Sequence, residues 1–135
     1  MDTLVRAHSG LRYVVLALLL AAIYTAFTKK SETNAGYSKV YLWALIATHT
    51  QILIGLALYF MSPKVDFSMM SDKVFRFFTA EHITGMLIAA VLITIGHRQA
   101  KNLNHAKVLM YYGIGLIIIL ASIPWPFRNL GGSWF

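Results

Sequence analysis

Residues 41–60 have the sequence YLWALIATHTQILIGLALYF, twenty residues without an aspartate, glutamate, lysine or arginine. A helix that spans a bilayer needs about 20 mostly apolar residues, and in lipid a helix satisfies all its own backbone hydrogen bonds. This run therefore predicts a transmembrane helix. The middle of the run carries an ionisable side chain, His49.

Three further apolar runs predict three further spans. We place the four helices at about residues 4–27, 40–61, 75–96 and 104–123. No clear small-residue cleavage site follows the first run, so we expect a retained helix rather than a cleaved signal peptide. Short links make sequential helices antiparallel neighbours. The sequence thus predicts an all-α integral membrane protein, an up-down four-helix bundle in one domain over residues 1–135.

The composition agrees with a membrane protein, because 58% of the residues are apolar and 13% are charged. Cysteine is absent, which excludes disulfides, thiolate metal sites and a covalently attached haem. The net charge is +7, but the basic residues sit at the edges of the apolar runs, where they meet lipid headgroups. We therefore expect membrane lipid as a partner and no nucleic acid.

The orientation follows the lysines and arginines near the helix ends. One side of the predicted bundle has six of them and the other has five; the six are Lys29, Lys30, Lys39, Arg98, Lys101 and Lys107. These six are densely clustered at helix ends. We place that side in the cytoplasm, which puts both termini on the outer side.

Three histidines, His8, His49 and His82, lie inside the apolar runs. An ionisable group at membrane depth costs roughly 2.5 kcal/mol or more, so it marks a candidate functional site. Neutral imidazole is the cheapest such group to bury and a common metal ligand. We therefore expect these imidazoles to hold a metal or a haem, with His97 as a further metal-ligand candidate.

A haem with two imidazole ligands needs histidines at similar depth on helices that face each other. With a rise of 1.5 Å per residue, His8 lies ~12 Å and His82 ~8 Å toward the outer side, whereas His49 lies near the midplane. His8 and His82 fit best, on the first and third helices, which are diagonal in such a bundle. His49 with His82 is the second choice, and His49 with His97 fits poorly. One haem b is the economical prediction; two haems would require spans placed differently.

Charged and polar neighbours extend this site. Arg12 lies one helical turn below His8, and a buried arginine needs an anionic partner, which Glu81 or a haem propionate could supply. Arg76 lies where propionates pointing outward would sit. Four further side chains could hydrogen-bond a ligating imidazole or a quinone, which is a second candidate ligand: Tyr13, Gln51, Tyr59 and Thr84.

Other interpretations stay open. His49 could bond to a serine or threonine across the bundle, and His97 and His105 could be solvated loop residues. Methionines together with histidines can bind Cu(I), and four methionines are predicted toward the outer side: Met61, Met69, Met70 and Met86. A copper carrier and a non-catalytic subunit of a larger membrane complex are therefore alternatives. No hydrolase or nucleotide-binding motif is present, which favours a relay or accessory subunit over a self-contained enzyme.

Several motifs together resemble small bacterial four-helix membrane proteins labelled cytochrome b: His8-Ser-Gly-Leu-Arg-Tyr13, His49-Thr-Gln-Ile-Leu-Ile-Gly55 with Tyr59, Arg76-Phe-Phe-Thr-Ala-Glu-His82, Ile95-Gly-His97 and Ile123-Pro-Trp-Pro126. More distantly they resemble the b561 and copper-resistance D classes of membrane cytochrome. The resemblance implies haem iron, electron transport in the bacterial inner membrane, and partner subunits of a quinol-linked respiratory chain. The matching ligand candidates are His8, His49, His82 and His97. The last predicted helix carries no interior histidine, unlike bundles that bind two haems.

Overall fold

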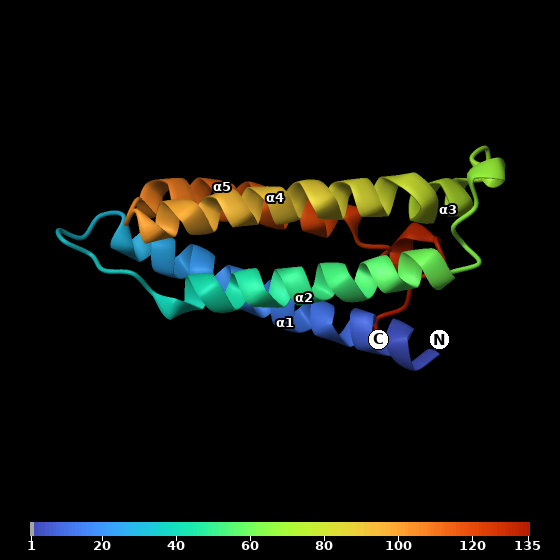
Figure 1. The fold of residues 1–135 in the computed structure, drawn as a ribbon, viewed down its shortest axis with the longest axis horizontal. Helices are drawn as coiled ribbons and strands as arrows, with labels where there is room; N and C mark the ends of the chain where they lie inside the picture. Colours follow the sequence, from blue (N-terminus) through green and yellow to red (C-terminus); the bar gives the residue numbers. More distant parts are fainter. Residues whose placement is uncertain (1) are drawn as a thin grey trace.

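Four long helices lie side by side in the computed structural model, which describes residues 2–135 (Figure 1). The first is α1 (Asp2–Lys29) and the second is α2 (Lys39–Met61). The third is composite and ends in α4 (His82–Lys101), and the fourth is α5 (His105–Ser122). The described residues contain no strand. All four helices are long and apolar enough to cross a membrane, so the prediction of four apolar helices is confirmed.

The helices form a ring of neighbours. α1 packs against α2 and α5, and α4 packs against α2 and α5, so α1 and α4 lie on one diagonal of the bundle. Both chain ends lie at one end of the bundle, together with the link between α2 and the third helix (Figure 1). We call this the terminal end. The links over residues 30–38 and 102–104 lie at the opposite end.

The third helix is interrupted near its start. It begins as α3 (Lys73–Arg76), continues as a π-helical turn, η2 (Phe77–Glu81), and then becomes α4. The backbone N–H of His82 bonds to the carbonyl of Phe77, five residues back. Such π-turns are rare and are frequent at functional sites. This one places His82 at the first residue of α4.

Local capping sets two of the helix starts. The Asp72 carboxylate accepts hydrogen bonds from the backbone N–H groups of Val74 and Phe75, at 2.9 and 3.3 Å, and so begins α3. The Asn104 side chain accepts from the N–H of Lys107 at 3.2 Å and begins α5. Short 3-10 turns follow α2 and α5, as η1 (Phe67–Met69) and η3 (Pro126–Arg128).

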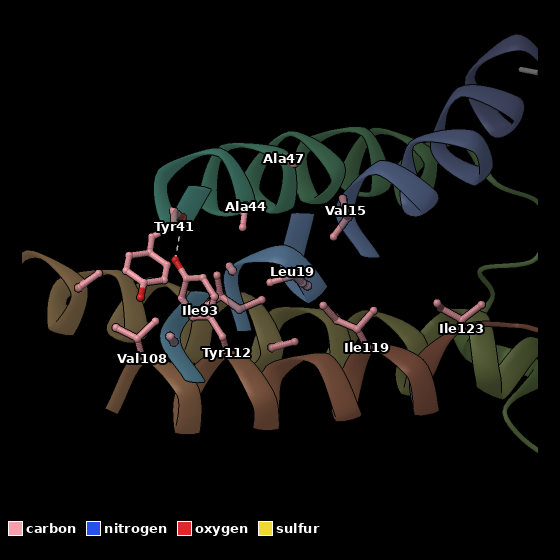
Figure 2. Packing of buried hydrophobic residues seen from close by; sticks show 14 residues of the cluster. Val15, Leu19, Tyr41, Ala44, Ala47, Ile93, Val108, Tyr112, Ile119 and Ile123 are labelled. Atoms are coloured by element: carbon pink, nitrogen blue, oxygen red, sulfur yellow. Dashed lines mark hydrogen bonds between the residues drawn. The ribbon is translucent and has the colours of Figure 1, made fainter. Parts of the chain in front are cut away.

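The core combines small residues with a few large ones, and it is densest toward the opposite end (Figure 2). Tyr41 and Tyr112 are fully buried, and the Tyr112 hydroxyl donates to the Tyr41 carbonyl at 2.8 Å. Gly96 lets α4 approach α5, because a Cβ built on it would lie 2.6 Å from Cδ1 of Tyr112. Large apolar side chains such as Leu53, Phe60 and Ile117 point outward and are two-thirds or more exposed.

The approach at Gly96 yields a prediction. Gly96→Ala is expected to lower the free energy of unfolding by about 1–3 kcal/mol, because the new methyl overlaps two packed tyrosines. Gly113→Ala is the matched control, since a Cβ there meets nothing within 4 Å. The control should keep its stability or gain up to about 1 kcal/mol from helix propensity. Thermal unfolding in detergent, followed by circular dichroism, measures both; equal stability of the two variants contradicts the packing.

Candidate functional site

A cavity of about 340 Å³ opens between the four helices in the half of the bundle nearest the terminal end. This volume lies in the range of small-molecule sites. All four long helices, the link after α2 and the C-terminal tail (residues 129–135) contribute to its wall. The wall is mostly apolar, and none of the lining residues among 2–135 is an aspartate or glutamate.

His8 and His82 lie close together on the wall of this cavity, with their rings in a T-shaped arrangement. They come from α1 and α4, the diagonal helices, and their ring centres are 6.3 Å apart with planes at 80°. Two imidazoles bound to opposite sides of one metal ion, at about 2.0–2.1 Å from each nitrogen, would have ring centres roughly 6 Å apart. The observed spacing therefore suits a single ion between the two rings.

The tautomer of His82 is fixed by the end of α5. Nδ1 of His82 lies 2.6 Å from the carbonyl oxygen of Ser122, the last residue of that helix. The final carbonyls of a helix have no partner within it, and a carbonyl can only accept, so Nδ1 carries the proton. The Nε2 atom then keeps its lone pair for a ligand. The rings of Phe77 and Phe78 pack against the imidazole, with centres at 5.7 and 6.5 Å.

The ring of His8 packs on α2. A Cβ built on Gly55 would lie 3.0 Å from Cε1 of His8, so a larger residue at this position would require the ring to shift. One turn earlier, the side-chain amide of Gln51 donates to the backbone carbonyl of His8 at 2.6 Å. These two contacts hold the first turns of α1 against α2.

Three buried side-chain atoms lack a hydrogen-bond partner among the described residues. They are Nδ1 of His8, Nε of Arg12 and Oε1 of Gln51, and all three residues line the cavity. Buried polar atoms are nearly always paired, so each orphan needs an explanation. Their gathering around one cavity indicates a polar ligand or bound water in that space.

Arg12 is 8% exposed and is held by the C-terminal tail. Its Nη2 donates to the carbonyls of Ser133 and Trp134, at 2.6 and 2.5 Å, and its guanidinium lies 5.5 Å from the Trp125 ring centre. The prediction of an Arg12–Glu81 pair is wrong. Glu81 binds Arg76 at 3.0 Å, and both of those side chains are about half exposed.

Arg76 does not line the cavity, because its side chain is engaged with Glu81 at the surface. A different basic residue lines the cavity instead. Lys64, in the link after α2, lines the cavity and had no sequence signal beyond its place near a span end. The sequence did not predict the contact between Arg12 and the C-terminal tail either, because the two are more than 120 positions apart and no local pattern links them.

His49 lies apart from the pair. It is exposed on the outside of the bundle, and its Nε2 lies 2.9 Å from Oγ1 of Thr94 on α4. The Thr94 hydroxyl donates to the carbonyl of Ala90, so His49 is the donor in this contact. The alternative of a bond to a threonine on another helix is confirmed, but the contact lies on the outside of the bundle between neighbouring helices, and His49 does not border the cavity.

His97 and His105 belong to a hydrogen-bonded cluster near the opposite end. They are 7% and 5% exposed, so the interpretation as solvated loop residues is wrong. His105 donates from Nε2 to the carbonyl of Ala35 at 3.1 Å and accepts from the Tyr41 hydroxyl at 2.9 Å. Nε2 of His97 lies 2.8 Å from the Tyr37 hydroxyl, and burial raises the pKa of Tyr37, so this hydroxyl stays protonated.

Among residues 2–135, no group of three or more histidine, aspartate or glutamate side chains could hold a metal ion. His8 and His82 are the two histidines that line the cavity between the four helices. No family model, curated protein or solved structure matches this chain.

The hydrogen-bonded cluster around His105 yields a prediction. His105→Ala leaves the Tyr41 hydroxyl and the Ala35 carbonyl without their partner, so we expect a loss of about 1–3 kcal/mol in unfolding free energy. His49→Ala is the control, because this side chain is exposed and makes a single bond. Thermal denaturation compares the two. A His49 variant that loses as much stability as the His105 variant refutes the assignment.

Proposed function

We propose that this chain is a multi-pass membrane protein that holds one haem b between His8 and His82 and relays single electrons. The proposal is supported above all by the pairing of these two imidazoles, whose ring centres are 6.3 Å apart and which both line the cavity from the diagonal helices α1 and α4. The exposed apolar surface of the helices supports the membrane setting.

The surroundings of the pair fit such a group. Nδ1 of His82 is tied to Ser122, which is how metal-ligating histidines are usually oriented. The cavity wall supplies apolar contacts from several helices, including Ile83, Met86 and Ile119. Unpartnered polar atoms remain at its edge, on Arg12 and Gln51.

When bound, a haem iron takes up and gives back one electron. The protein's own groups would fix the two ligands, set the hydrogen bond on Nδ1 of His82 and keep water from the site. Phe77 and Phe78 hold the His82 ring in place. The cavity wall carries no carboxylate among the described residues, which suits a relay better than a proton-transferring enzyme.

We place this relay in a bacterial inner membrane, with the terminal end outward and next to a quinol-linked respiratory complex. A quinone would be the electron partner rather than the occupant of the His8–His82 cavity, because both imidazoles are then engaged. The copper alternative has less support, since Met86 lines the cavity while Met61 and Met69 are exposed on the surface.

One observation favours a place for this chain within a larger membrane complex. His49 lies near the middle of α2 and is exposed on the outside of the bundle. Ionisable residues in membrane helices almost always face protein or water, so a bare His49 would be costly in lipid. A partner helix over this face would cover it, and the chain would then be the haem-bearing subunit of a larger assembly.

Visible absorption tests the haem proposal. The purified protein, reconstituted with haem, should show Soret and α bands that sharpen when dithionite is added. His8→Ala and His82→Ala should each lose most of the bound haem, because each removes one ligand. His49→Ala is the control and should retain it, since that ring lies outside the cavity. Absence of a Soret band in the wild type, or loss of haem in the His49 variant, refutes this site.

The absence of cysteine makes the orientation testable. Thr33→Cys and Ser71→Cys place single thiols in exposed positions at the opposite and terminal ends. In intact cells a membrane-impermeant maleimide should label the Ser71 variant, and the Thr33 variant should react only after permeabilisation. The reverse labelling pattern would show that the terminal end faces the cytoplasm. Labelling of both variants in intact cells would contradict a retained four-span protein.

A further inference from the structure

The cavity carries two cations and no balancing acid. Arg12 and Lys64 both line it, and its lining residues include no aspartate or glutamate among residues 2–135. Residues 2–135 form one ion pair, between Arg76 and Glu81, and it lies on the surface away from the cavity. A mostly apolar cavity with this charge favours a ligand that brings negative charge.

The Arg12 guanidinium is hydrogen-bonded to backbone carbonyls and not paired with an anion. Its bonds run to the carbonyls of Ser133 and Trp134 and to the Tyr13 hydroxyl, and its Nε has no partner among the described residues. A buried cation without an anion is costly, and neutral carbonyls compensate only part of that cost. Nε of the guanidinium therefore has unused capacity for a charge-assisted hydrogen bond to a carboxylate.

Lys64 meets the same stretch of tail. Its Nζ lies 4.8 Å from the Phe78 ring centre, and a Cβ built on Gly131 would lie 3.1 Å from it. No hydrogen bond or ion pair to this Nζ is formed within residues 2–135. Gly131 and Ser133 are two residues apart, so the tail brings both cations to one part of the cavity edge.

We propose that Arg12 and Lys64 form an anion subsite for the carboxylate of a ligand whose apolar body fills the His8–His82 cavity. In the present structure the carbonyls of the tail occupy part of the place of that carboxylate. Two sources share this chemistry, the propionates of a haem and the head of a membrane fatty acid. For the first source the inference rests on the proposed function; for the second it stands independently.

Haem and haem dimethyl ester form the decisive pair of probes, because the ester has the same ring and iron but no free carboxylate. Visible absorption titration gives the affinity of each for the wild-type protein. We expect haem to bind about tenfold more tightly than its ester, as for the loss of one charge-assisted bond. The ratio of the two affinities cancels general effects of a substitution on folding.

Lys64→Met should remove most of this preference, and Lys64→Glu should reverse it in favour of the ester. Lys73→Met is the matched control, because Lys73 is an exposed lysine at the same end that does not line the cavity. It should keep the wild-type ratio. Equal binding of haem and ester by the wild type, or an unchanged ratio in both Lys64 variants, overturns the subsite and leaves the haem site standing.

If neither tetrapyrrole binds, the proposed function fails and the subsite is decided by oleate against methyl oleate. Quenching of tryptophan fluorescence reports this binding, because the Trp125 ring lies next to Arg12. Tighter binding of oleate, lost in Lys64→Met and kept in Lys73→Met, supports the subsite. Equal binding of acid and ester overturns it.

Discussion

A polar group inside a bundle of apolar helices has to find its partner within the protein, because the surroundings offer none. The two ends of this bundle meet that constraint differently. Toward the opposite end, Tyr41, His105 and Tyr112 bond to one another and to nearby carbonyls, so these polar groups are paired within the protein. Near the terminal end, His8, Arg12 and Gln51 each keep an unpartnered atom around a cavity. The unpartnered atoms near the terminal end are therefore the ones available to a ligand.

Much of the fold followed from the sequence, since four apolar runs of sufficient length leave little choice of secondary structure. The similar level of His8 and His82 along the bundle followed as well, because a helix rises by a fixed step per residue. The depths of ~12 and ~8 Å already favoured His8 with His82. Their contact across the bundle then depends on α1 and α4 being diagonal, which short links impose.

The direction in which a side chain points was harder to predict. α2 is apolar all round, so no polar stripe showed that His49 faces outward while Gln51, two residues later, borders the cavity. The π-turn before His82 adds one residue to a helical turn and so rotates the residues that follow it. The pattern of apolar and polar residues over 77–81 does not predict this turn. The Arg12–tail contact joins residues too distant in sequence for any local pattern to predict.

The charge of the cavity links ligand binding to the proposed relay. Arg12 and Lys64 stabilise negative charge in a space of low dielectric, where such interactions are stronger than in water. An arriving electron is itself a negative charge. In the proposed relay, the cations that suit a carboxylate would therefore also favour the reduced state of a haem held between the two imidazoles.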